Sequence, residues 1–314
     1  MLKVGLVGVG GISGAHIPAW QAIENAELVA LCDIRPEQMD KYENIHKYTD
    51  FEEMLRCEQL DIVDICLPTF LHADYAVKAL ECGINVVCEK PISLKKEDVA
   101  RVYDTAERNG VKFMVAQVLR FWPEFEFVRS LYQNGTYGRL LSGNMTRLGN
   151  CPGWSWDNWM KDEARSGLVP FDLHIHDLDF MVYTFGKPQN AVCHRSKQPD
   201  QDHISVLYEF GDFYITSESS WYASPYPFCG SFRFQFENAV VAYENNELAV
   251  YERGGGKKTQ GTEAEGDTGE INLPKSNAFE MELSYFADCV INDQPVSKVK
   301  PHELETVIDI LKQL

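Results

Sequence analysis

The sequence contains no pair of cysteines at C-x-x-C spacing. Its nine cysteines are odd in number and are scattered over the 314 residues. Several lie within apolar runs, where cysteine behaves as a small hydrophobic residue. These features argue against a disulfide framework and against a structural zinc site, so the expected compartment is a reducing cytoplasm.

Long apolar runs and clusters of positive charge are also missing. The longest apolar runs, such as residues 62–67 with Asp64 inside, fall far short of the ~20 residues that span a membrane. The start of the chain is broken by glycines and has no cleavage-like site, so a first strand is expected there. Lys and Arg number 29 against 47 Asp and Glu, which gives a net charge of −18 at pH 7. Neither a membrane nor a nucleic acid is therefore an expected partner.

The first 120 residues alternate short β-branched runs with helical patterns. This alternation predicts a parallel, doubly wound α/β sheet that is covered on both faces. The expected strands cover residues 3–7, 27–32, 61–67, 85–88 and 112–116, and the expected helices cover 15–24, 36–44, 51–57, 72–82 and 95–109.

Residues 121–314 have a different pattern, dominated by strand-like runs that alternate polar and apolar residues. Such alternation is typical of an antiparallel sheet with one covered face. We therefore expect two domains: residues 1–120 as a nucleotide-binding α/β domain, and residues 121–314 as an α+β domain on a large, mainly antiparallel open sheet. Helices are expected at 123–133, 277–292 and 301–314, and a polar, glycine-rich loop at 253–270.

A glycine-rich turn follows the first expected strand and opens the first expected helix. It contains Gly8, Gly10, Gly11 and Gly14. Dinucleotides place their pyrophosphate on the free N–H groups of such a turn. Asp33 ends the second expected strand, where a carboxylate accepts hydrogen bonds from the adenosine ribose. This position favours NAD. The nearby Arg35 leaves NADP open as the cofactor. The alternative is a non-binding α/β domain in which Asp33 only caps a helix.

Two further segments carry ionisable groups. Lys90 follows the strand at 85–88, at the edge where ligands bind parallel sheets, although a surface lysine before a turn would look the same. Asp172, His176 and Asp179 lie at helical spacing, so a carboxylate could orient the imidazole. The alternatives there are a capped helix start, or a metal site of the Asp-x-His-x-His type. We expect no metal, because few other histidines are present to complete such a site.

Together these segments resemble the glucose–fructose oxidoreductase / inositol dehydrogenase (Gfo/Idh/MocA) family over nearly the whole chain. One difference is His174, where relatives often have glycine. The motifs that carry the resemblance are Gly8-x-Gly10-Gly11-Ile12-Ser13-x-x-His16, Pro68-Thr69-x-x-His72, Glu89-Lys90-Pro91, Arg120-Phe121-x-Pro123 and Asp172-x-x-x-His176-x-x-Asp179.

The resemblance implies an N-terminal Rossmann domain and a nicotinamide-dependent dehydrogenase that acts on a sugar, inositol or related cyclic polyol. It also implies a homodimer or homotetramer that forms through the C-terminal sheet. Lys90, Asp172 and His176 would be catalytic. The residues implied to line the cofactor are Gly8, Gly10, Gly11, Ile12, Asp33, Thr69, His72 and Glu89.

Two side chains are candidates for substrate contact. Arg120 lies in one of the family motifs, and Trp156 lies in a tryptophan-rich stretch whose aromatic faces suit stacking against a sugar ring. Two other functions stay open. One is a redox-neutral enzyme that oxidises a sugar transiently, eliminates a group and reduces the sugar again with tightly held NAD. The other is a non-catalytic NAD-binding regulator.

Overall fold

The computed structural model describes residues 1–260, 269–271, 273 and 277–314. Their contacts divide the chain into two compact units. The first contains residues 1–118, 154–167 and 277–308, and the second contains 119–153, 309–314 and the described residues between 168 and 273. The first unit is thus assembled from three stretches of sequence, and the functional division at residue 120 stays a prediction.

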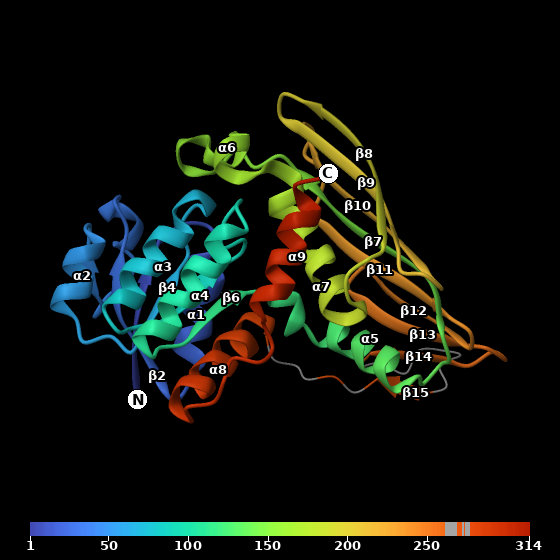
Figure 1. Cartoon of the computed structure of the whole chain (residues 1–314), viewed down its shortest axis with the longest axis horizontal. Coiled ribbons are helices and arrows are strands. Elements are labelled where there is room, and N and C mark those ends of the chain that lie inside the picture. Colours follow the sequence, from blue (N-terminus) through green and yellow to red (C-terminus); the bar gives the residue numbers. More distant parts are fainter. Residues whose placement is uncertain (261–268, 272, 274–276) are drawn as a thin grey trace. The chain divides into compact units, whose positions relative to one another are not determined.

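The first unit is built on a six-stranded parallel sheet (Figure 1). Its strand order, β3-β2-β1-β4-β5-β6, is that of the doubly wound Rossmann fold. The strands are β1 (Leu2–Val7), β2 (Ala26–Cys32), β3 (His46–Tyr48), β4 (Ile62–Ile65), β5 (Asn85–Glu89) and β6 (Phe113–Ala116). Every residue of β4 and β6 is buried, as expected for strands of a parallel sheet that helices cover on both faces.

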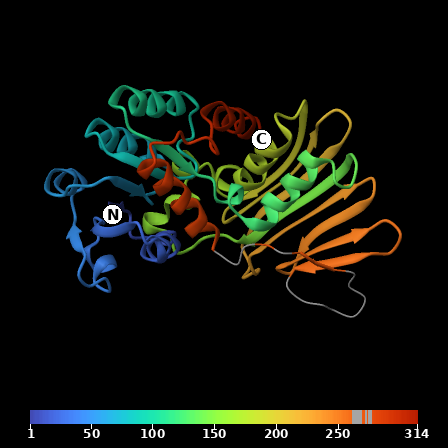
Figure 2. The same cartoon turned by 90° about the horizontal axis from the view of Figure 1, so that it is seen from below.

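Helices α1 (Ser13–Ala22), α2 (Phe51–Cys57), α3 (His72–Glu81) and α4 (Glu97–Asn109) alternate with these strands. Helix α3 packs against α4, and α1 packs against α8 (Ala278–Ile291), which returns from the end of the chain (Figure 2). The helix expected at 36–44 is wrong beyond its first turn. Only a short 3-10 helix, Pro36–Met39, forms there, and the chain then adds the unpredicted edge strand β3, which pairs with β2 alone.

The second unit contains a nine-stranded sheet in the described residues, in the order β15-β14-β13-β12-β11-β7-β10-β9-β8. The pairs β7–β10 and β14–β15 are parallel and the others are antiparallel, which confirms the predicted fold class. The strands are β7 (Leu140–Asn150), β8 (Asn190–Gln198), β9 (Gln201–Glu209), β10 (Tyr214–Tyr222), β11 (Cys229–Phe236), β12 (Ala239–Glu244), β13 (Glu247–Glu252), β14 (Lys257–Gln260) and β15 (Gly269–Ile271).

Aromatic residues join the helices of this unit to its sheet. Phe125 of α5 (Pro123–Asn134) packs edge-on against Phe180 of α7 (Ile175–Phe185) and against Phe232 of β11, with 5.0 Å between ring centroids in both pairs. Edge-to-face pairs of this kind contribute stability beyond that of the apolar area they bury. The short 3-10 helix Val118–Arg120 precedes α5, and a π-helical turn, Pro170–His174, precedes α7.

The loop expected at 253–270 is corrected where the structure describes it. Lys257–Gln260 and Gly269–Ile271 are strands, and residues 261–268 of that prediction lie outside the described part. The remaining helices are the 3-10 helices Thr69–Leu71 and Trp156–Lys161, the single turn α6 (Glu163–Ser166), and α9 (Pro301–Leu311). No helix among the described residues is both long enough and apolar enough to cross a membrane.

Candidate functional site

The glycine turn joins the carboxyl end of β1 to the N-terminus of α1, as the sequence predicts. Gly8 has φ +96°, and a Cβ there would lie 2.6 Å from the carbonyl oxygen of Cys66, so only glycine fits. A Cβ on Gly10 would meet no atom within 4 Å. The first N–H groups of α1 have no partner within the helix and carry its positive dipole end. The turn therefore has the geometry of an anion site for a pyrophosphate.

Asp33 ties this turn to the end of β2. Its Oδ2 accepts the N–H of Val9 at 2.8 Å, and its Oδ1 accepts the N–H of Arg35 at 2.8 Å. The Nε of Arg35 lies 3.4 Å from Oδ1, close enough for an ion pair but without hydrogen-bond alignment. A carboxylate accepts about four hydrogen bonds, so Asp33 retains acceptor capacity for a ribose.

His72 links the segment after β4 to the segment after β5. Its ring nitrogens lie 2.7 Å from the carbonyl oxygen of Pro91 and 2.6 Å from that of Leu67. Burial lowers the pKa of His72, although the two carbonyls favour its charged form. The neighbouring Thr69 is also buried. His72 thus braces the edge of the sheet where the second half of a dinucleotide would lie.

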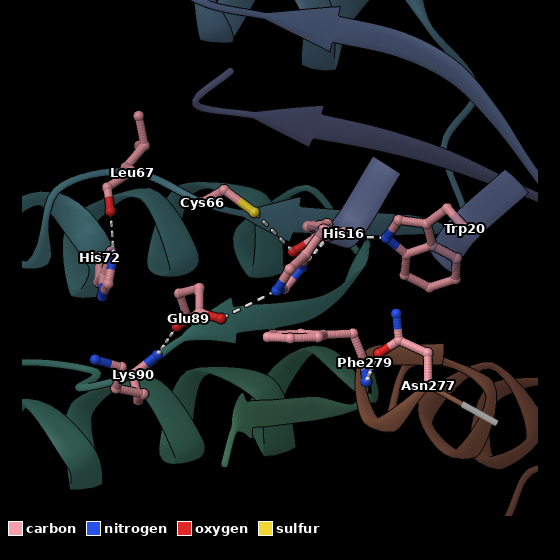
Figure 3. Close-up of polar contacts among 10 residues, drawn as sticks. His16, Trp20, Cys66, Leu67, His72, Glu89, Lys90, Asn277 and Phe279 are labelled. Carbon is pink, nitrogen blue, oxygen red and sulfur yellow. Dashed lines mark hydrogen bonds and ion pairs between the residues drawn. The ribbon is translucent and has the colours of Figure 1, made fainter. Parts of the chain in front are cut away.

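Glu89 and Lys90 follow at the end of β5. One carboxylate oxygen of Glu89, Oε2, accepts the N–H of Lys90 at 3.0 Å, and the other, Oε1, lies 3.0 Å from Nε2 of His16 (Figure 3). Lys90 is half-buried. Asp64 of β4 lies 2.8 Å from the other ring nitrogen of His16. The sequence analysis assigns no role to His16 or Asp64. The position of Asp64 inside the apolar run of β4 is nevertheless a signal, because a buried carboxylate needs a polar partner.

The segment 154–167 belongs to the first unit and brings its tryptophans there. The ring of Trp154 lies over the glycine turn, since a Cβ on Gly11 would be 2.8 Å from it. Trp156, the predicted substrate residue, is 37% exposed and lies under the guanidinium of Arg165, which also covers the ring of Phe70. Trp156 therefore has an aromatic surface open to solvent in the same unit as the glycine turn.

In the second unit, Asp172 lies in the π-helical turn Pro170–His174 and His176 lies in the first turn of α7. Both side chains are half-buried, whereas His174 between them is fully buried. The ring nitrogens of His174 lie 3.0 Å from the hydroxyl of Ser219 and 2.7 Å from that of Tyr208. Burial, helped by the positive charge of Arg147, lowers the pKa of His174 to about 3.

This helical geometry counts against the metal alternative. Side chains two residues apart on a helix face different directions, so the Asp-x-His-x-His pattern does not converge as it would on a strand. Among the described residues, the group that is close enough to hold a metal is His16, Asp64 and Cys66. There the imidazole is already hydrogen-bonded to Asp64.

Arg120 and Asp179 form a buried ion pair. The guanidinium donates to both carboxylate oxygens, at 2.8 and 2.6 Å, and its side chain is 0% exposed. It also stacks on the ring of Tyr183. Arg120 was predicted to contact substrate, and Asp179 was predicted to orient His176. Their burial and bidentate pairing form a structural contact that joins α7 to the chain before α5, and the two predicted roles stay predictions.

Comparisons with known proteins agree with this geometry. Residues 2–117 match the GFO_IDH_MocA model, described as an oxidoreductase family with an NAD-binding Rossmann fold, and residues 125–269 match the GFO/IDH/MocA C-terminal domain. The structure of levoglucosan dehydrogenase with NADH and levoglucosan superposes with a TM-score of 0.83, at 20% identity, over 99% of this chain and 95% of that one. At this identity the likeness shows the fold.

Two curated proteins illustrate the range of similar sequences. The D-glucoside 3-dehydrogenase of Escherichia coli (strain K12) is 30% identical over 192 residues, which are 60% of this chain and 55% of that protein. The 2,7-anhydro-N-acetylneuraminate hydratase of Mediterraneibacter gnavus is 31% identical over 211 residues, 63% of this chain and 53% of that protein. The chain spans about half the length of the curated relatives it matches.

Proposed function

Because the chain belongs to the Gfo/Idh/MocA family, we propose that it is an NAD-dependent dehydrogenase acting on a CH–OH group of a sugar, inositol or related cyclic polyol. The observation that carries the cofactor assignment is the hydrogen bond that joins the glycine turn to Asp33. One carboxylate holds the Val9 N–H in the turn and stands at the end of β2. A ribose fits this arrangement, whereas a 2′-phosphate would be repelled by the carboxylate.

Lys90, Asp172 and His176 are the proposed catalytic residues. The glycine turn and Asp33 would hold NAD, and the bound cofactor would supply a hydride acceptor for the oxidation of the alcohol. His176 takes the hydroxyl proton as the general base, and the Lys90 ammonium donates a hydrogen bond to the oxygen as negative charge develops on it. Asp172 accepts a hydrogen bond from a neighbouring hydroxyl. In the reverse direction His176 returns the proton to the oxygen of a ketone.

A hydratase among the similar proteins favours a second function for the same residues. In that case the alcohol is oxidised transiently, a group leaves or adds next to the carbonyl, and the hydride returns. The same proton transfers by His176 would serve this cycle, but no net NADH would accumulate.

Partner and substrate assignments follow from the same proposal. Trp156 offers an exposed aromatic face for a sugar ring.

Three apolar side chains on strands of the second unit are exposed in the single chain: Val192, Tyr214 and Tyr251. A homodimer or homotetramer that packs these strands together would cover them, and analytical ultracentrifugation measures that state.

The test is an absorbance assay at the nicotinamide band with NAD, and separately NADP, against inositols, aldoses, aminosugars and sugar acids. Lys90→Met is the matched variant. We expect turnover with NAD for one group of compounds and its loss in the variant. If no NADH accumulates, mass analysis of the mixtures distinguishes the redox-neutral cycle, which yields a new product, from a non-catalytic regulator, which yields none.

A further inference from the structure

A buried row of charged groups, Asp64, His16 and Glu89, leads from β4 to the backbone N–H of Lys90. The imidazole of His16, in the first turns of α1, lies between two carboxylates that are distant in sequence. Nδ1 is 2.8 Å from Oδ2 of Asp64, and Nε2 is 3.0 Å from Oε1 of Glu89 (Figure 3). The side chains of His16 and Asp64 are 0% exposed.

This geometry requires a particular protonation state of the ring. A neutral imidazole has one N–H, so one of its nitrogens would present a lone pair to a carboxylate. An imidazolium donates to both. Burial disfavours the charged ring, but the charge of Asp64, together with Cys66, outweighs burial and raises the pKa of His16 well above its ordinary value. His16 therefore joins Asp64 and Glu89 through two charge-assisted hydrogen bonds.

The far end of the row is fixed. Asp64 accepts a second hydrogen bond from the indole N–H of Trp20 at 2.7 Å, and its Oδ1 lies 3.6 Å from the thiol of Cys66. The ring of Phe279, on α8, packs against His16 with 5.7 Å between centroids. The imidazole thus contacts Asp64 on β4 and Phe279 on α8, and Trp20 on α1 fixes Asp64, so the direction of the ring toward Glu89 is set.

The near end of the row is Lys90. Glu89 has one oxygen on the His16 ring and the other on the backbone N–H of Lys90, and Figure 3 shows the lysine side chain extending away from this cluster. Resting on the proposed role of Lys90 in catalysis, we propose that His16 is a positioning residue. Through Glu89, it holds the main chain from which the Lys90 ammonium is presented.

The charges themselves support a positioning role over simple packing. Removing carboxylates and an imidazolium from water is costly, and apolar side chains of similar volume would fill the same space without that cost. Apolar side chains, however, could not fix the orientation of the Glu89 carboxylate. Hydrogen bonds fix both oxygens of Glu89, and with them the start of the Lys90-Pro91 segment.

The test measures the Lys90 amide directly and needs no substrate. Amide hydrogen exchange is followed by NMR in the full chain, with His16→Leu, which removes both donors, and His16→Gln, which can donate at one end only. The matched control is Trp20→Phe, which removes one donor to Asp64 and leaves the His16–Glu89 contact. Val86 and Val87 of β5 serve as internal references, and thermal melting identifies the folded variants.

We expect the Lys90 amide to exchange at least tenfold faster in His16→Leu, less so in His16→Gln, and at the wild-type rate in Trp20→Phe, with Val86 and Val87 unchanged. Should His16→Leu fail to fold, His16→Gln decides. A wild-type rate at Lys90 in the folded His16 variant overturns the proposal, and so does equal acceleration in Trp20→Phe or along β5.

A kinetic measurement separates this inference from the function on which it rests. With a compound that is turned over, His16→Gln should lower kcat by about tenfold and leave the Kd for NADH within twofold. In a Lys90→Met background the same substitution should have no further effect on kcat. If Lys90→Met retains wild-type turnover, the proposed function fails, while the exchange result still reports on whether His16 holds Lys90.

Discussion

Removing Asp179 should destabilise the second unit strongly, because it would leave Arg120 charged, buried and without its carboxylate. The pair is bidentate, at 2.6 and 2.8 Å, and the two side chains are 0% and 1% exposed. Breaking a buried pair of this kind costs about 3–5 kcal/mol. For a unit of this size, each kcal/mol lowers Tm by roughly 2–4 °C, so Asp179→Ala should lower the Tm by about 6–20 °C.

The matched control is Asp157→Asn, which breaks an ion pair of similar length in the first unit and keeps a side chain that tolerates the left-handed φ of +50° at this position. The distance from Arg165 to Asp157 is 2.9 Å, but Asp157 is 66% exposed. Exposed pairs contribute at most about 1 kcal/mol, so this control should hardly move Tm. Differential scanning calorimetry measures the Tm of both variants and of the wild-type chain. A Tm for Asp179→Ala within 2 °C of the control would refute the structural role assigned to Arg120.

Three other substitutions have definite expected outcomes. Gly8→Ala should abolish NADH binding in a fluorescence titration, because a Cβ would collide with the Cys66 carbonyl at a φ of +96°. Asp33→Ala should lower the ratio of the NADPH Kd to the NADH Kd by at least tenfold, since the carboxylate that repels a 2′-phosphate is gone. Burial lowers the pKa of His174 to about 3. Between pH ~6.5 and 3 the unfolded chain therefore binds a proton at His174 that the folded chain does not bind. The free energy of unfolding falls accordingly as the pH is lowered through this range. The fall in Tm between pH 7 and pH 4 should therefore be smaller in His174→Gln than in wild type; an equal fall would show that His174 does not titrate in this way.

The parts of the site that are local in sequence could be predicted. The glycine turn, the strand before it and the helix after it lie within about twenty residues, and the spacing to Asp33 reflects a single βαβ unit. Burial of the strands follows from their apolar runs, so the parallel, doubly wound sheet could be predicted from periodicity.

The parts that depend on tertiary convergence could not be predicted. His16 meets Asp64 from 48 residues away and Glu89 from 73 residues away. Helical spacing placed Asp179 on the same face as His176, but nothing local indicated that Arg120, 59 residues earlier, binds Asp179. The edge strand β3 was missed for a related reason: its three residues are exposed or half-buried, so they carry no apolar signal.

The proposed function requires that this chain exchange a hydride with bound nicotinamide by means of Lys90 and His176. The most direct measurement mixes the protein–NAD complex with the sugar and polyol panel in a stopped-flow instrument and follows nicotinamide absorbance within the first turnover. A single turnover detects bound NADH whether or not the reaction is redox-neutral overall. We expect bound NADH to form with one group of compounds and to be slowed by at least a hundredfold in both Lys90→Met and His176→Ala. Saturating NAD with no absorbance change for any compound, or unaltered rates in both variants, would contradict the account.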